Sequence, residues 1–517
     1  FFVSKRRIYP MKTSIFKRSM ALFLAFLLCF TTFIGSAVTP AFASAAQSEV
    51  CVISFPREGD ANYNATWGHG DLNFMGGWHD KATRFLSIHA VGSFTGEICY
   101  CIEPGVNALI GDKVTQQDES FWDNYPSNDA PTEAAAMRHD LMRGLKQGKP
   151  FALMEQTPSV TNWLSYNMLK RPGVMRLWSY QAMAHGADTI MFFQMKRSIG
   201  ACEKYHGAVI DHAGHENTRV FREVAQLGAE LDLLGDQTLG ARCDASVAIL
   251  FDWDNWWGIS CSAGPSVYLD YCNEVQRYYK ALYDLNIPVD MIGVEDDLSG
   301  YGLVIAPVLY MVKTGYDEKI RAFVKNGGRF LTTFFSGYVD EHDLVTVGGY
   351  PGRLRDILGI WVEEEDALPE DMQNHFHYQG RTYPASMLCD LLHTEGADAL
   401  AFYEEDFYAG MPVLTKNAFG KGFGYYVATR SSDEFYRNYL GEICKEAGIS
   451  PIMDTPDGVE VTRRVNQNGT FVFLLNHRED TFVTALSFAG TDLLSGKSYE
   501  TGDALTLEKK DVAILKI

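Results

Sequence analysis

The sequence has little positive charge and lacks a phosphate-binding loop. Its 517 residues include 45 Lys and Arg against 65 Asp and Glu, a formal net charge of −20 at pH 7. Because phosphate contacts need clustered Lys and Arg, this balance argues against a nucleic-acid-binding protein. The glycine pairs at 327–328 and 348–349 have no G-x-G-x-x-G context, so we interpret them as turns rather than as part of a nucleotide site.

The ten cysteines contain no C-x-x-C pair. Cys99 and Cys101 are separated by one residue, which is too tight for a zinc knuckle, and the other cysteines are scattered along the chain. The spacing therefore predicts neither a disulfide framework nor a metal centre. We expect no cofactor.

The amino-terminal pattern is that of a secretory signal peptide over residues 11–45. Basic residues precede an apolar stretch at 21–34, and the small-residue sites Ala-Phe-Ala and Ala-Ser-Ala follow it. A transmembrane anchor fits less well, because the apolar stretch is short and is interrupted by Gly, Pro and Thr. We therefore expect a secreted or cell-surface protein with no membrane association after cleavage.

The segment 46–128 is expected to be a β-rich fragment, with strands at 50–53, 85–88 and 97–102. Its motifs ISFPREGD, WGHGDLNFMGGWH, CYCIEPG and FWDNYPSN resemble the thioester domain of Gram-positive surface adhesins. In that family a Cys condenses with a Gln to form an internal thioester that captures host amines. Cys101 matches that Cys better than Cys99 does. The family's Gln lies beyond the matching motifs, so we expect two ordinary strand cysteines here.

Residues 129–240 alternate helical and strand patterns. Helices are expected at about 132–145, 175–185 and 218–234, and strands at 151–155 and 189–194. This order suits the βα units of a parallel barrel or sheet.

The strand at 151–155 ends in a carboxylate, Glu155, and Pro158 prevents its continuation. Carboxyl ends of parallel strands are where α/β enzymes place their chemistry, although a Glu that simply enters solvent is equally compatible. Glu203 and His206 follow the second strand, and Trp163 follows the first. Carboxylates beside an aromatic face suit a pyranose site, in which two carboxylates lie roughly 5–5.5 Å apart for retention and 6.5–9.5 Å for inversion.

The remaining chain divides into two further units. Residues 241–453 continue the strand and helix alternation, which predicts a doubly wound, flavodoxin-like sheet. The pattern of residues 454–517 favours β-strands throughout, and Asn468-Gly469 between apolar runs indicates a β-hairpin. We expect a small β-sandwich there.

From about residue 131 to 517 the chain resembles the β-galactosidases of glycoside hydrolase family 42. The matching motifs include DLMRGLKQGKPFALMEQTPS, FQMKRSIGACEKYHGAVIDHAGHENTRVFREV and GGYPGRLRDILGIWVEE. The resemblance implies an α/β protein with a carboxy-terminal fragment of a (β/α)₈ barrel, a flavodoxin-like trimerisation domain and a carboxy-terminal β domain. It also implies a homotrimer that acts as a retaining hydrolase and releases terminal β-galactose.

Residue by residue, the resemblance makes Glu155 the nucleophile at the end of barrel strand 7. Trp163 matches a wall of the galactose pocket, and Glu203 and His206 match ligands of the sugar hydroxyls. The family's acid/base Glu, which follows an Asn on strand 4, has no counterpart, and residues 129–240 supply only strands 7 and 8. The family's metal-binding cysteines are also unmatched, so we expect no zinc.

These departures predict a chimera, with an adhesin-like head joined to a hydrolase tail near residues 128–131, that is a poor catalyst alone. A secreted adhesin that uses Cys101 and a non-catalytic trimeric scaffold built on residues 243–450 are the alternatives. The two parts also imply different locations. The signal peptide implies export, whereas enzymes that resemble the tail often work in the cytoplasm.

Overall fold

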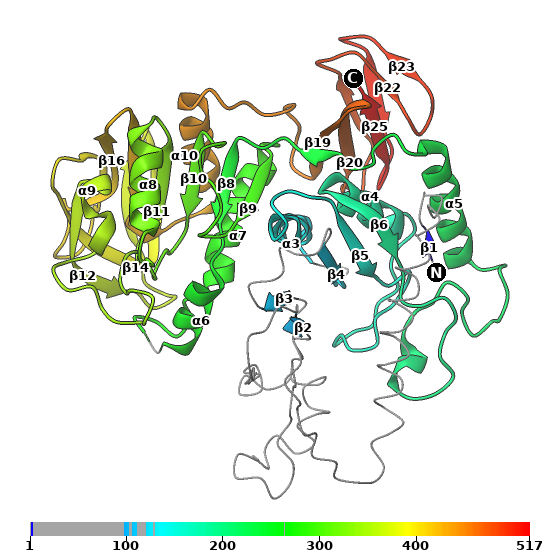
Figure 1. Ribbon diagram of the computed structural model, residues 1–517, viewed down its shortest axis with the longest axis horizontal. Coiled ribbons are helices and arrows are strands. Elements are labelled where there is room, and N and C mark those ends of the chain that lie inside the picture. Colours follow the sequence, from blue (N-terminus) through cyan, green and yellow to red (C-terminus); the bar gives the residue numbers. More distant parts are fainter. Residues whose placement is uncertain (1, 4–97, 103–105, 111–119, 128–129, 263) are drawn as a thin grey trace, which may run out of the picture. The chain divides into compact units, whose positions relative to one another are not determined.

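A computed structural model describes residues 2–3, 98–102, 106–110, 120–127, 130–262 and 264–517 (Figure 1). The chain forms two compact units, one made of residues 1–3 with 117–517 and the other of residues 4–116. In the second unit the described residues form an antiparallel pair of strands, β2 (Ile98–Ile102) and β3 (Val106–Ile110). The expected signal peptide lies outside the described residues, and so does the side chain of Cys101.

A four-stranded sheet with the order β1-β6-β5-β4 carries the strand that ends in Glu155. Strands β4, β5 and β6 run parallel, and β1 pairs antiparallel with β6. Helices α3 and α4 connect the parallel strands in turn, and α5 follows β6. The elements are β1 (Phe2–Val3), β4 (Ser120–Asp123), α3 (Thr132–Gly144), β5 (Phe151–Glu155), α4 (Val174–Ala184), β6 (Ala187–Met191) and α5 (Arg219–Leu234).

The sheet begins earlier in the chain than the sequence predicted, because it includes strand β4. The sequence pattern predicts a boundary at residue 128 with two strands after it, but β4 precedes that boundary and pairs with β5. A four-residue strand followed directly by polar residues has no long apolar run to reveal it. The segment FWDNYPSN, compared above with an adhesin, therefore contributes to the sheet that holds Glu155.

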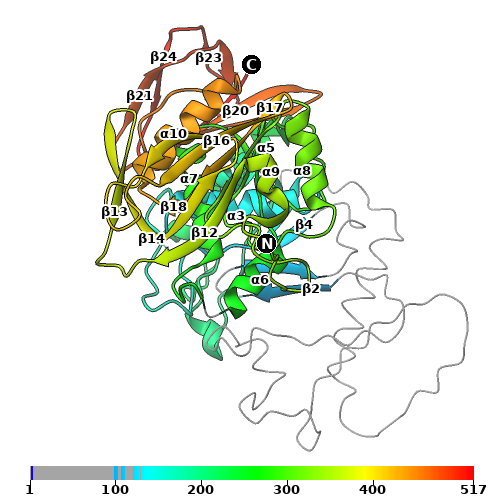
Figure 2. The same cartoon turned by 90° about the vertical axis from the view of Figure 1, so that its left-hand side faces the viewer.

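The middle of the chain is a doubly wound unit built on a seven-stranded sheet. Its parallel strands lie in the order β9-β8-β10-β11-β17, which is the flavodoxin order 2-1-3-4-5, and β16 and β15 extend it antiparallel beyond β17. Figure 2 shows α7 and α10 on one side of the sheet and α8 and α9 on the other. The strands are β8 (Val247–Leu250), β9 (Val289–Ile292), β10 (Leu303–Ala306), β11 (Arg329–Thr333), β15 (Asp398–Phe402), β16 (Pro412–Phe419) and β17 (Gly422–Val427). The helices are α6 (Trp253–Cys261), α7 (Tyr271–Asp284), α8 (Tyr316–Lys325), α9 (Arg355–Leu358) and α10 (Asp433–Glu446).

A second, antiparallel sheet in this unit was not anticipated from the sequence. Strand β14 lies between β12 and β13 and also pairs with β18. The strands of this second sheet are β12 (Ile360–Ala367), β13 (Asn374–Tyr378), β14 (Arg381–Thr394) and β18 (Thr429–Arg430). Charged residues interrupt these strands, so their alternation of apolar and polar positions is weak.

The carboxy-terminal part has two β layers. A six-stranded sheet with the order β23-β22-β25-β20-β19-β7 packs against the pair β21-β24 through a separate apolar core that includes Leu474 and Leu505. The predicted hairpin joins β19 to β20, with Asn466 opposite Gly469. Strand β7, at residues 242–243, pairs with β19, although the sequence boundary at 241 placed it in the preceding unit. The strands are β7 (Arg242–Cys243), β19 (Val459–Asn466), β20 (Gly469–Asn476), β21 (Phe482–Ala485), β22 (Gly490–Asp492), β23 (Ser498–Tyr499), β24 (Ala504–Leu507) and β25 (Val512–Lys516).

Helix α3 lies directly against strand β9 of the doubly wound unit. A Cβ added at Gly144 would stand 1.9 Å from the carbonyl oxygen of Met291, so only glycine permits this approach. The close contact fixes the sheet that carries Glu155 against its neighbour. Among the described helices, none is long and apolar enough to cross a membrane.

Candidate functional site

The candidate site starts at the carboxyl ends of β4 and β5. Asp123 and Glu155 are register partners on these parallel strands, so their backbones lie side by side. Two residues further on, Tyr125 donates a hydrogen bond from Oη to Glu155 Oε2 over 2.7 Å. The backbone N–H of Asn124 donates a hydrogen bond to the backbone carbonyl oxygen of Glu155 over 2.9 Å. The half-buried Glu155 carboxylate is therefore held by a phenol from the neighbouring strand end.

An aromatic group stands beside Glu155. The ring centroids of Tyr125 and Trp163 are 4.9 Å apart in an edge contact, and the rings of Trp163 and His206 stack at 5.3 Å. His206 also meets Tyr125 edge-on at 5.6 Å. Because 44% of Trp163 remains exposed, the ring offers accessible apolar surface in contact with Tyr125, which bonds to the carboxylate. A face of this kind is what a sugar ring packs against.

His206 is fully buried, and its Nδ1 lies 3.1 Å from Asn162 Oδ1. Burial is the main cause that lowers its pKa to about 4, so the imidazole is neutral near pH 7. Its Nε2 has no hydrogen-bond partner among the residues that the structure describes. A neutral imidazole with a buried, unused nitrogen can bond one hydroxyl of a ligand.

Glu203 is less closely integrated than the other predicted site residues. It lies in the short 3₁₀ turn η5 (Cys202–Tyr205) and its side chain is exposed. Its charge contributes to the raised pKa of Tyr125, which places it in electrostatic reach of the cluster. The structure thus brings Glu155, Trp163 and His206 together around Tyr125, with Glu203 at the margin.

Burial, reinforced by like charge, determines the electrostatics of this cluster. Burial, followed by the charge of Glu155, raises the pKa of Asp123 to about 7. Burial and the Glu155 carboxylate also raise the pKa of Tyr125 well above its ordinary value, so the phenol stays a hydrogen-bond donor. The Asp123 carboxyl therefore holds its proton up to about pH 7.

Sequence reasoning missed Asp123 and Tyr125. Both lie in the segment that was compared with an adhesin, and no motif there marks them as partners of Glu155. The available signal was a short apolar pair, Phe121-Trp122, followed at once by the polar residues Asp123 and Asn124. That pattern repeats, in shorter form, the apolar run that ends at Glu155.

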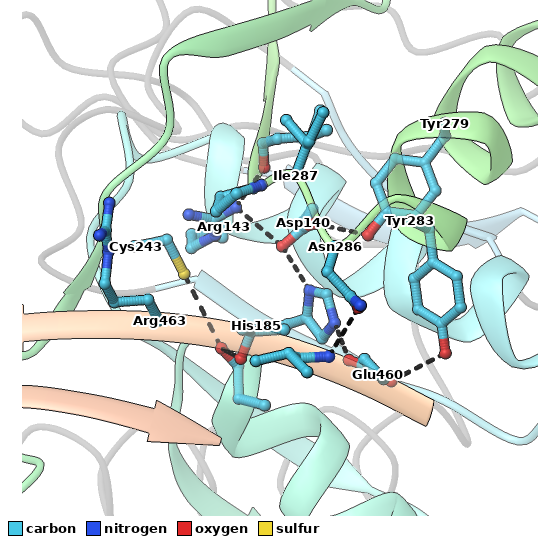
Figure 3. A pocket seen from close by; sticks show the side chains of 15 residues that line it. Asp140, Arg143, His185, Cys243, Tyr279, Tyr283, Asn286, Ile287, Glu460 and Arg463 are labelled. Atoms are coloured by element: carbon cyan, nitrogen blue, oxygen red, sulfur yellow. Dashed lines mark hydrogen bonds and ion pairs between the residues drawn. The ribbon is translucent and has the colours of Figure 1, made fainter. Parts of the chain in front are cut away.

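A second cluster of ionisable groups is buried where α3, α4, α7 and β19 meet, around a cavity of about 30 Å³ (Figure 3). His185 lies between two carboxylates, with Nδ1 2.9 Å from Asp140 Oδ1 and Nε2 2.6 Å from Glu460 Oε1. Tyr279 donates to Asp140 over 2.6 Å and Tyr283 donates to Glu460 over 2.9 Å. Burial alone would lower the pKa of His185, but the two carboxylates raise it to about 9.

This second cluster has the geometry of a structural joint. Asp140 also accepts from Arg143, and Glu460 also accepts from His477. Burial opposes ionisation of Glu460, yet its cationic and hydrogen-bonding neighbours hold its pKa far below the usual range. Nearly every charge is matched and the cavity is small, so the cluster ties three parts of the chain together and leaves little room for a substrate.

The described residues contain no group of three or more His, Cys, Asp or Glu side chains that could hold a metal ion. The expectation of no zinc and no cofactor stays a prediction.

Three family models match the chain in sequence order. Residues 111–234 match a β-galactosidase model, 245–450 a β-galactosidase trimerisation domain and 458–516 a β-galactosidase carboxy-terminal domain. The first match includes β4, so it covers Asp123 and Tyr125 as well as Glu155.

Individual relatives agree with these matches. The β-galactosidase BgaA of Planococcus sp. (strain 'SOS Orange') is 58% identical over 406 residues, which are 77% of this chain and 60% of that protein. The β-galactosidase BgaB of Geobacillus sp. (strain Y412MC61) is 44% identical over 401 residues, covering 76% of this chain and 59% of its own. The crystal structure of the β-galactosidase from Bacillus circulans sp. alkalophilus superposes with a TM-score of 0.77 at 53% identity, over 78% of this chain and 61% of that one.

The class that the fold and these matches define is that of the glycoside hydrolases. Within it, the chain from residue 111 onward belongs to the family 42 β-galactosidases. The chain spans about three-fifths of the length of the curated relatives that it matches, at 60% and 59% for the two relatives above.

Proposed function

We propose that this chain carries the nucleophile half of a retaining β-galactosidase site that releases terminal β-D-galactose. The observation that carries the proposal is the position of Glu155. It ends a parallel strand and accepts a hydrogen bond from Tyr125, whose ring contacts the partly exposed Trp163. The β-galactosidase match over residues 111–234 supports the choice of substrate class.

In the proposed reaction, a Glu155 carboxylate oxygen attacks the anomeric carbon of the bound galactoside. A new C–O bond forms to Glu155 while the bond to the leaving group breaks, and the leaving oxygen takes a proton from a carboxylic acid. Water then cleaves the galactosyl ester and restores the carboxylate. Trp163 would pack against the sugar ring, and His206 and Glu203 would bond its hydroxyls. Tyr125 would orient the attacking carboxylate.

We further propose that catalysis by this chain alone is impaired. Retaining hydrolases use a second carboxyl group roughly 5–5.5 Å from the nucleophile, on the side of the leaving group. Asp123 lies on the strand adjacent to Glu155 and Glu203 is exposed at the margin, and we assign the acid role to neither. Without a positioned proton donor, galactosides with poor leaving groups should react about 10²–10⁴-fold more slowly.

A substrate with an acidic leaving group separates these two parts of the proposal. A 2,4-dinitrophenyl β-galactoside needs no proton donor for bond cleavage, so the purified chain should form a galactosyl ester at Glu155 that intact-mass and peptide-mass spectrometry detect. Lactose should react far more slowly. Glu155→Gln should abolish labelling, whereas Glu216→Gln, at an exposed position, should not. Equal labelling of the Glu155→Gln variant would contradict the assignment.

We also propose that residues 241–453 mediate a homotrimer. The match to a trimerisation domain over 245–450 and the intact flavodoxin strand order support this. Light scattering of the full chain should give the mass of three copies, and a monomer at micromolar concentration would contradict it. A trimer that fails to label with the activated galactoside would instead favour a non-catalytic scaffold. The signal-peptide pattern makes export part of the proposal, which fractionation of the producing cells would test.

A further inference from the structure

A second cavity lies along the connection between β5 and α4, which is the same connection that carries Trp163. Its volume is about 340 Å³, far larger than the 30 Å³ cavity of the buried cluster. A water molecule occupies about 30 Å³ in the liquid, so this space has room for a small organic molecule. None of the predicted galactose ligands lines it.

A buried lysine lines this cavity. Only 2% of Lys170 is exposed, and its Nζ donates one hydrogen bond, to the Thr157 carbonyl oxygen over 2.5 Å. The ammonium also lies 4.7 Å from the ring centroid of Trp178. Within the described part of the chain, no carboxylate lies within ion-pair distance of Nζ. An ammonium has three N–H donors, so two of them remain available.

Such a cation is costly to bury without a counter-ion. Burial lowers the pKa of Lys170 to about 7, which is the response expected of an ammonium that lacks a negative partner. An anion in the adjoining cavity would supply the missing charge.

The rest of the lining is rich in hydroxyl groups. It includes the side chains of Ser127, Thr157, Ser159, Thr161 and Ser165. Thr161 is 3% exposed, and its Oγ1 has no hydrogen-bond partner among the residues described. Buried polar atoms are nearly always satisfied in native proteins, so this unpaired hydroxyl, on a residue that lines the cavity, indicates a missing partner.

We propose that this cavity binds a small polyhydroxylated carboxylate, such as an aldonate or uronate, with its carboxylate on Lys170 and its hydroxyls on the Ser and Thr side chains. A neutral polyol would leave the lysine charge unmatched, and a simple carboxylate would leave the hydroxyl lining unused. The proposal does not depend on catalysis at Glu155. It assigns a second ligand to the loop that also carries the galactose-facing Trp163.

Titration calorimetry of the full-length chain tests this site with sodium gluconate, sorbitol and sodium acetate as probes. Gluconate should bind about tenfold or more tightly than either sorbitol or acetate. Sorbitol lacks the carboxylate that would pair with Lys170, and acetate lacks the hydroxyl groups. Lys170→Met should weaken gluconate about tenfold or more, and Thr161→Val about threefold to tenfold. Lys421→Met, at an exposed position, should have no effect.

The remaining outcomes also decide the proposal. Equal binding of sorbitol, or unchanged gluconate binding in Lys170→Met, would overturn it. Glu155→Gln should leave gluconate binding unchanged, since loss of binding would place the probe in the galactose pocket instead. If Lys170→Met fails to fold by circular dichroism, the Thr161→Val variant and the three-probe comparison on the unmodified chain decide. No detectable gluconate binding at millimolar concentration would mean a cavity that holds water only.

Discussion

Two clusters in this protein use the same residue types in opposite ways. The Glu155 cluster and the Asp140–His185–Glu460 cluster each combine carboxylates, histidine and tyrosine hydroxyls. In the first, Asp123 and Glu155 repel one another and His206 is neutral, with an unused nitrogen. In the second, a cationic His185 is bonded to a carboxylate on either side.

The two clusters differ because the ionisable groups of one are paired with opposite charges and those of the other are not, although their residue types are similar. In the structural joint the opposite charges outweigh burial, so Glu460 stays ionised and His185 stays protonated. In the candidate site burial acts without an opposite charge, which raises the pKa of Asp123 and lowers that of His206. Unmatched groups beside an exposed aromatic face can interact with a ligand, whereas matched groups hold the chain together.

Glu460→Gln should have the largest effect, because it breaks the joint. The change removes the charge that faces His185 at 2.6 Å and weakens the acceptor for Tyr283 and His477. Loss of one partner from a buried ion pair costs about 3–5 kcal/mol. Urea unfolding followed by tyrosine and tryptophan fluorescence should show a large fall in midpoint, whereas the exposed Glu500→Gln should leave it unchanged. Equal midpoints would mean that the cluster is not a joint.

The pH dependence of stability should reveal the charge on His185. The folded pKa is about 9, against 6.5 in the absence of perturbation. The folded state therefore binds the extra proton, and this stabilisation is complete below about pH 6.5 and is lost as the pH rises through 9. Unfolding midpoints measured from pH 6.5 to 9.5 should fall in the parent chain and fall less in His185→Gln. The exposed His342→Gln should follow the parent; a parallel slope in His185→Gln would remove His185 as the cause.

Tyr125→Phe tests whether the first cluster serves a reaction. It removes the 2.7 Å hydrogen bond to Glu155 while the ring contacts remain. A hydrogen bond to a charged group contributes about 1.5–3 kcal/mol, so galactosylation by the dinitrophenyl substrate should slow about tenfold or more. Tyr268→Phe, at an exposed position, is the matched control. An unchanged labelling rate would show that Tyr125 does not orient Glu155.

Asp123→Asn should change the pH profile of stability rather than the labelling reaction. A carboxyl group whose folded pKa is raised to about 7 binds more protons when folded, so its contribution to stability declines as the pH rises from about 4 to 7. The Asn variant has no such titration and should gain stability relative to the parent between pH 4 and pH 8. Asp454→Asn, at an exposed position, should show no such gain. A constant difference across that range would contradict the raised pKa.

Much of the architecture was predictable from local patterns. An apolar run located β5, helical spacing located α3, α4 and α5, and Asn468-Gly469 located the β19–β20 turn. Glu155 was identified because a strand end can be recognised from Pro158 and the apolar run before it. Trp163 and His206 followed from the family resemblance, and the structure places both rings in contact with Tyr125, which bonds to Glu155.

Other features could not be seen in the sequence. Strand β4 is too short to carry a pattern, so Asp123 and Tyr125 were missed. Asp123 is the register partner of Glu155 on the neighbouring strand, and Tyr125 donates a hydrogen bond to the Glu155 carboxylate. The antiparallel sheet around β14 was missed because charged residues interrupt its alternation. Glu460 lies 275 residues from His185, and no local rule connects residues that far apart.

The sequence by itself determined the order of the units, the helices and longer strands, and the carboxylate at the end of β5, because short-range periodicity and turn residues encode them. Only the tertiary structure decided which ionisable groups meet. It placed Asp123 against Glu155, His185 between Asp140 and Glu460, and Lys170 beside a cavity without a counter-ion. Protonation states depend on burial and on neighbours brought from distant segments, so the same residue types became a candidate reactive site in one place and a structural joint in another.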